Sequence, residues 1–146
     1  MKILVSLLIL TSSLTAVAQK QVKVPILKSK LVSQVWRSDY NLFSDEKRLE
    51  YHIFSREEDE YFPWGNSVEF TDSTFSTSYS ASCGNDCFIS VLGSYKFIAS
   101  NRIEVFVETI TRNGMCMDKS ESPKKKFGTY EIIEEENRHL IKKVTP

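Results

Sequence analysis

The feature that most constrains this chain is a period-two alternation of apolar and polar side chains. Leu49, Tyr51 and Ile53 alternate with polar neighbours, and the same spacing returns in several later runs. Successive side chains of a β-strand point to opposite faces, so each run offers one face to a core and one to water. The expected strands are residues 32–37, 47–55, 67–71, 74–81, 88–99, 102–112, 127–134 and 138–144.

The links between several of these runs are short and polar, as in Asp72-Ser73 and Ser100-Asn101. Links of this length join antiparallel neighbours. Closure into a barrel removes the exposed edges that about eight sequential strands would otherwise leave. We therefore expect an all-β fold, an antiparallel up-and-down barrel over residues 31–146. The best helical pattern, residues 39–47, is weak.

The first eighteen residues have the pattern of a secretory signal peptide. Lys2 precedes an apolar run, and Ala16-Val17-Ala18 is a small-x-small cleavage pattern. The run is too short to span a bilayer, which takes about 20 apolar residues. We expect cleavage after Ala18, a secreted or periplasmic protein without a transmembrane segment, and a surface leader over residues 19–30. A short strand is expected at Pro25–Leu27.

The charge of the exported part argues against two classes of partner. Without Lys2, 18 Lys and Arg face 19 Asp and Glu, a formal charge of −1. Nucleic-acid phosphates require a net basic surface, so nucleic acid is not expected as a partner. The same charge does not favour an anionic membrane surface as a partner.

Three cysteines, Cys83, Cys87 and Cys116, allow one intramolecular disulfide and leave one thiol over. An exported chain lies where disulfides persist. Sequence does not choose among the three pairings, although a bridge from Cys83 or Cys87 to Cys116 would join two adjacent strands at one end. The alternative is a metal or redox site on the three thiols, completed by His52 or His139. We expect the disulfide, and expect both histidines at the surface.

Aromatic side chains supply the candidate binding residues. The inward faces of the expected strands carry Tyr51, Tyr79, Tyr95 and Tyr130, which we predict to contact a ligand in the lumen together with Trp36. A buried hydroxyl needs a hydrogen-bond partner, so inward tyrosines indicate a polar network or a partly wet cavity. A second aromatic group, Tyr61, Phe62 and Trp64, lies in the acidic link over residues 56–66.

Three features together resemble the lipocalin-like group of small secreted bacterial barrels. They are Trp36 on the first strand after a basic leader, the strand meander, and Gly128-x-Tyr130 opening the last hairpin. The resemblance covers Leu31 to Val144. It implies binding of a small apolar or amphipathic molecule in the barrel mouth, with Trp36 packing the closed end.

The expected function is therefore non-enzymatic binding of a small hydrophobic or amphipathic ligand. No acid, base and nucleophile constellation is evident, and no catalytic residue, metal ligand or cofactor is expected. The first alternative is a protein-interaction or inhibitor module acting through the aromatic link over residues 56–66. The second is the metal or redox protein built on the three cysteines.

Overall fold

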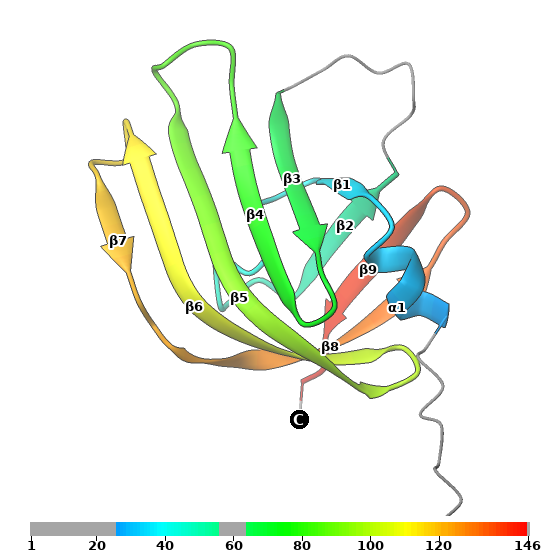
Figure 1. The fold of residues 1–146 in the computed structure, drawn as a ribbon. Helices are drawn as coiled ribbons and strands as arrows, with labels where there is room; N and C mark the ends of the chain where they lie inside the picture. Colours follow the sequence, from blue (N-terminus) through cyan, green and yellow to red (C-terminus); the bar gives the residue numbers. More distant parts are fainter. Residues whose placement is uncertain (1–25, 56–63, 146) are drawn as a thin grey trace, which may run out of the picture.

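The strands of this protein close into a barrel. A computed structural model describes residues 26–55 and 64–145 (Figure 1). One helix precedes nine strands. The elements are α1 (Ile26–Leu31), β1 (Val35–Ser38), β2 (Glu50–Phe54), β3 (Gly65–Phe70), β4 (Thr74–Ser80), β5 (Cys87–Ala99), β6 (Arg102–Gly114), β7 (Lys119–Glu121), β8 (Lys125–Glu134) and β9 (Arg138–Lys143).

The pairing closes on itself and is antiparallel throughout. The sheet order is β5-β4-β3-β1-β2-β9-β8-β6-β7, and β5 also pairs with β6. Eight strands therefore form the ring, while β7 extends it by pairing with the far half of β6. The expected closed antiparallel barrel is confirmed, and the expected strands match β1–β6, β8 and β9 to within a few residues. The sequence pattern missed α1 and β7.

One strand departs from the simple meander. β1 pairs with β2 through Arg37 and Ser38, and with β3 along its whole length. It therefore lies between two strands that are consecutive in the chain, and β2 closes the ring against β9. Only two residues of β1 pair with β2, so few backbone hydrogen bonds join these two strands of the barrel wall.

The alternation in sequence corresponds to alternation in burial. Along β6, Ile103, Val105 and Val107 are buried while the residues between them are more exposed. Along β5, Val91, Gly93 and Tyr95 face the same interior. The inward side chains of all eight ring strands thus form one hydrophobic core.

Gly93 lies where the register between β5 and β6 shifts. A Cβ at this position would lie 2.3 Å from the carbonyl oxygen of Phe106 and 2.7 Å from the ring of Phe75. Only a residue without a side chain allows this close approach of strand to strand. The extra residue in β6 is Glu108, which leaves Ile110 on the inner face.

The helix α1 packs against one end of the barrel, in the part of the chain expected to be a surface leader. Leu27 and Leu31 are buried in the core, and Trp36 Nε1 donates a 2.9 Å hydrogen bond to the Leu31 carbonyl. The strand predicted at Pro25–Leu27 is therefore wrong, because Leu27 lies in the helix. With Leu27 and Leu31 four residues apart, one helix face covers the core.

The segment between β1 and β2, residues 39–49, crosses the interior and is called the strap here. It is not helical, contrary to the weak pattern over residues 39–47. Asn41 donates to the Ile89 carbonyl at 2.7 Å and accepts from the Thr77 hydroxyl, so the strap is tied to β4 and β5. These bonds hold Phe43 in the core, at a left-handed φ of 58°.

The far rim of the barrel, away from α1, is held covalently. A disulfide joins Cys87, at the start of β5, to Cys116, just past β6, with Cα atoms 5.1 Å apart. Cys83 is an exposed free thiol. The expected single disulfide is thus confirmed, with the Cys87–Cys116 pairing. Among the helices in the described ranges, none has the length and apolar character needed to cross a bilayer.

Candidate functional site

The residues predicted to contact a ligand in the lumen lie mostly in a packed core. Tyr51 and Tyr130 have no exposed surface, and Trp36 and Tyr95 are 4% exposed. Tyr79, nearer the far rim, is half-buried. The structure thus brings four of the five predicted residues into one interior, where Tyr51 and Tyr130 contact each other and Phe43 of the strap.

Phe43 fills the space between these side chains. Its ring centroid lies 5.5 Å from Tyr51, 4.9 Å from Phe75 and 5.0 Å from Tyr130, each at a steep interplanar angle. Such edge-to-face contacts are the favoured packing of aromatic rings. The middle of the lumen is therefore occupied by the chain itself, a role that no periodic signal around Phe43 indicated.

The tyrosine hydroxyls differ in how they are satisfied. Tyr51 donates to the Asp45 carbonyl at 3.1 Å, and Tyr95 donates to the Thr71 carbonyl at 2.6 Å. Burial raises the pKa of each of these two phenols to about 12. The Tyr130 hydroxyl is buried and has no hydrogen-bond partner among the described residues. Burial raises the pKa of Tyr130 as well.

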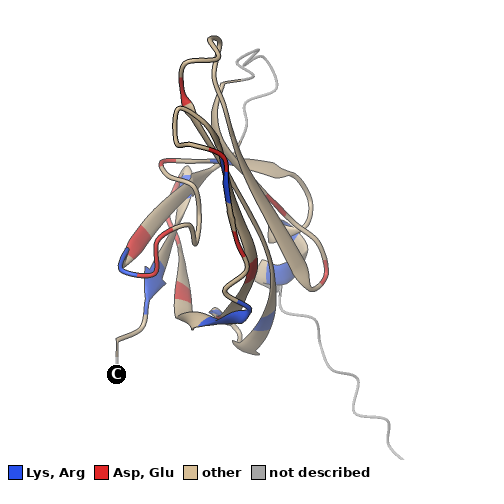
Figure 2. Ribbon diagram, turned by 90° about the vertical axis from the view of Figure 1, so that its left-hand side faces the viewer, with Lys and Arg blue, Asp and Glu red and all other residues tan. Residues whose placement is uncertain are grey.

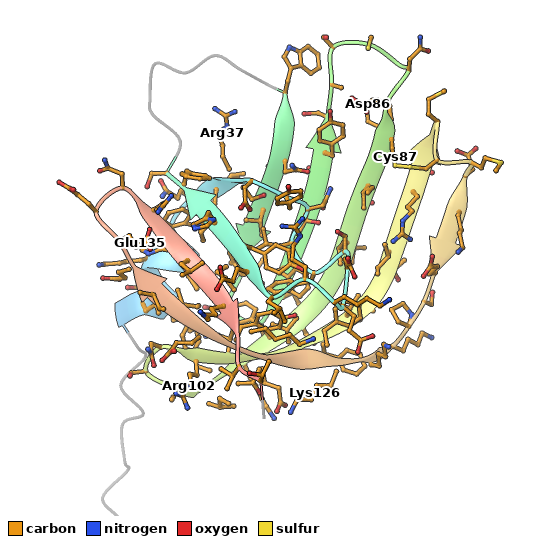
Figure 3. The ribbon with its side chains drawn as sticks, turned by 180° about the vertical axis from the view of Figure 1, so that it is seen from behind. Arg37, Asp86, Cys87, Arg102, Lys126 and Glu135 are labelled. Atoms are coloured by element: carbon orange, nitrogen blue, oxygen red, sulfur yellow. A yellow bond between two sulfur atoms is a disulfide. The ribbon has the colours of Figure 1, made fainter. Side chains whose placement is uncertain are left out.

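The aromatic link of the first alternative falls largely outside the described residues, which exclude Tyr61 and Phe62. Trp64, at its end, is 44% exposed. Met115 and Met117 are 72% and 83% exposed near the same rim, where the Met115 amide bonds to the Asp86 carbonyl. Figure 3 shows Asp86 and Cys87 at this rim, distant from Glu135.

The cysteine alternative loses two of its three thiols to the disulfide. No group of three or more His, Cys, Asp or Glu side chains suited to a metal ion occurs within residues 26–55 and 64–145.

A pocket opens where β2 ends. Phe54, the last residue of β2, lies opposite Arg37 of β1 and Arg138 of β9. Beyond it, β1 and the β8–β9 turn continue with no β2 residue between them. The space is about 630 Å³ and is called the wall pocket here. Its walls come from α1 and the segment after it (Lys30, Gln34), from Trp36 and Ser55, and from Glu134–His139.

His139 forms part of the inner wall of this pocket. It is 9% exposed and packs against Trp36, with ring centroids 4.9 Å apart and an angle of 62°. Its Nδ1 is buried with no hydrogen-bond partner in the described chain. Burial, assisted by the charge of Lys30 and opposed by Glu134, lowers the pKa of His139 below its usual value of 6.5. The ring is therefore neutral at neutral pH.

The prediction that His139 lies on the surface is wrong. The residue stands two positions from Ile141, which is also buried, so the period of the strand places both on the inner face. That spacing was the signal that could have identified it. His52 faces outward, as expected from its neighbours, and its Nδ1 lies 3.1 Å from Asp39 Oδ2.

Charged groups form the mouth of the wall pocket. Lys30 reaches both carboxylate oxygens of Glu134, at 3.0 and 3.2 Å, and Arg138 pairs with Glu135. Glu136, at the tip of the β8–β9 turn, has no hydrogen-bond or ion-pair partner among the described residues. Elsewhere on the barrel, charges of both signs are interspersed (Figure 2), as where Glu104 binds both Lys96 and Lys126.

Comparisons with protein-family models, curated proteins and solved structures returned no match. The fold and the geometry of the pocket are therefore the basis for any statement about function.

Proposed function

We propose that this protein is a non-enzymatic binding protein that takes a small amphipathic molecule into the wall pocket. The observation that carries the proposal is the inner wall of the pocket, formed by the rings of Trp36 and His139 beneath a charged mouth. The other lining side chains are polar or charged, and a volume of about 630 Å³ lies within the usual range for ligand sites.

This proposal moves the ligand away from the predicted position in the middle of the lumen. Phe43 and the tyrosines fill that space with ring-to-ring contacts. Trp36 is the one predicted ligand residue that also lines the wall pocket. Entry through the wall requires no displacement of the strap.

An extracytoplasmic location belongs to the same proposal. The disulfide supports it, because such bonds are rare in reducing compartments. The signal peptide predicted for residues 1–18 lies outside the described residues. Mass determination of the secreted or periplasmic protein tests both points, with an N-terminus at Gln19 expected and retention of Met1–Ala18 contradicting it.

The two tryptophans allow a direct test of binding and of its place. The Trp64→Phe variant leaves Trp36 as the single tryptophan. Titration with phenylpropanol, a neutral molecule with one aromatic ring and one hydroxyl, should produce a saturable change in Trp36 emission. The wild-type protein serves as the control. No saturable response from Trp36, in a variant whose far-ultraviolet spectrum is unchanged, contradicts the proposal.

A second candidate function is protein interaction through the far rim. It is favoured by the exposure of Trp64 and Met115 at the rim of a filled lumen, since exposed apolar side chains can mark an interface. The same titration bears on it. A response present in the wild type but absent from Trp64→Phe would assign binding to the rim rather than to the wall pocket.

A further inference from the structure

In the described lining of the wall pocket, both cations are paired but one carboxylate is not, and this difference indicates which ligands the pocket accepts. The inference rests on the proposed function. The charged groups that line the pocket come from α1, the end of β8, the β8–β9 turn and the start of β9. The segment after α1, β1 and the residue after β2 contribute the uncharged Gln34, Trp36 and Ser55.

Both cations at the mouth are already engaged. Lys30 is held by the two oxygens of Glu134, and Arg138 by Glu135. A ligand with an anionic group would have to share one of these cations with a carboxylate that already binds it, and that carboxylate would repel it.

A carboxylate, in contrast, is available. Glu136 has no partner in the described chain and lines the same pocket. With three carboxylates, two cations and a neutral His139, the described lining carries a formal charge of −1. A ligand cation can use Glu136 without breaking an existing pair.

His139 provides an independent sign that the pocket is a ligand site. Its side chain is more than nine-tenths buried, it lines the pocket, and its Nδ1 lacks a partner in the described chain. A buried polar atom without a partner costs about 1–3 kcal/mol and is rare in folded proteins. The inner wall thus contains a buried polar atom that residues 26–55 and 64–145 leave without a partner.

From this arrangement we infer that the wall pocket selects amphipathic amines, with the ammonium group at Glu136 and an aromatic or short alkyl body toward Trp36 and His139. The neutral state of His139 suits this ligand, since an imidazolium beneath the ammonium would repel it. Protonation of His139 at acid pH therefore weakens amine binding, at a pKa that burial holds below the usual 6.5. The charged groups that line the pocket with this ring are Glu134, Glu135, Glu136, Lys30 and Arg138.

Three probes with the same hydrocarbon body test the inference in the Trp64→Phe background: phenylpropylamine, phenylpropanol and phenylpropanoate. We expect the amine to bind about two- to fivefold more tightly than the alcohol, the range of a solvent-exposed ion pair, and the acid to bind more weakly than the alcohol. Glu136→Gln should abolish the preference for the amine over the alcohol.

The control is Glu108→Gln, which removes an exposed carboxylate on β6, outside the wall pocket, and should leave the preference intact. The inference is overturned if the acid binds as tightly as the amine, or if the preference survives in Glu136→Gln. Failure of the proposed function is a different result, in which none of the three probes changes Trp36 emission.

Discussion

The middle of the barrel and the wall pocket lie in the same ring of strands, yet the middle is filled by side chains and the wall pocket is open. In the middle, the strap places Phe43 among three rings, and Tyr51 even bonds its hydroxyl to the strap. In the wall pocket, Trp36 and His139 present rings to an open space, and the Nδ1 of His139 has no partner among the described residues. Aromatic side chains on an inner strand face therefore do not by themselves mark a ligand site. What distinguishes the pocket is the open space beside its rings, because the packed middle also holds a polar atom without a partner in the described chain, the Tyr130 hydroxyl.

Phe43→Ala gives the strongest test of this difference. Truncating a fully buried Phe leaves a cavity and should lower the free energy of unfolding by about 3–5 kcal/mol, measured by urea denaturation. Leu49→Ala, at a 51% exposed position in the same strap, is the matched control and should change it by less than about 0.5 kcal/mol. A loss below about 1 kcal/mol for Phe43→Ala would mean that the strap does not complete the core and that the lumen is open to ligands.

At the far rim, we expect the stability of the fold to depend on the Cys87–Cys116 disulfide more than on side-chain packing. Replacing both Cys87 and Cys116 by Ser releases a constraint across 29 residues, which should cost about 3–4 kcal/mol of stability in the chain-entropy model. Cys83→Ser should have no such effect because that thiol is free and exposed. Thiol titration of the unreduced, denatured protein should count one cysteine. A count of three would show that the disulfide does not form and would favour the metal or redox alternative.

The sequence predicted the strands well because their alternation is local. It failed at the strap because Asn41, Leu42 and Phe43 are consecutive buried residues, which neither a strand nor a helix period produces. Their burial depends on partners far along the chain, such as Thr77 and Ile89.

The wall pocket was invisible in the sequence for a related reason. It arises because β2 ends where β1 and the β8–β9 turn continue, and that depends on β1 lying between β2 and β3. The period of β9 could have placed His139 inside. Nothing local to Lys30 or Glu136 indicated that the two share one pocket.

The tyrosine hydroxyls give a smaller test within the packed middle. Tyr95→Phe removes a bond to the Thr71 carbonyl and should cost about 1 kcal/mol. Tyr130→Phe removes a buried hydroxyl without a partner in the described chain, so the free energy of unfolding should stay the same or rise. Denaturation of the two variants under one condition measures the difference. A larger loss for Tyr130→Phe would show that its hydroxyl contacts a bound molecule or water, and that the middle is less completely packed than its rings indicate.

The smallest expected effect concerns the wall pocket and the pH. Burial lowers the pKa of His139 in the folded protein, so below pH 6.5 the unfolded chain binds a proton that the folded protein resists. Stability supplied by the neutral ring is therefore complete above pH 6.5 and is lost as the pH falls toward the lower pKa of the folded state. Urea denaturation between pH 7 and pH 5 should show this decline, and His139→Gln should reduce it. His52→Gln, which changes the only other histidine, is the matched control. If the decline in the His139→Gln variant equalled that of the wild type, His139 would not be held neutral by the fold, and the case for an amine beside a neutral ring would fail with it.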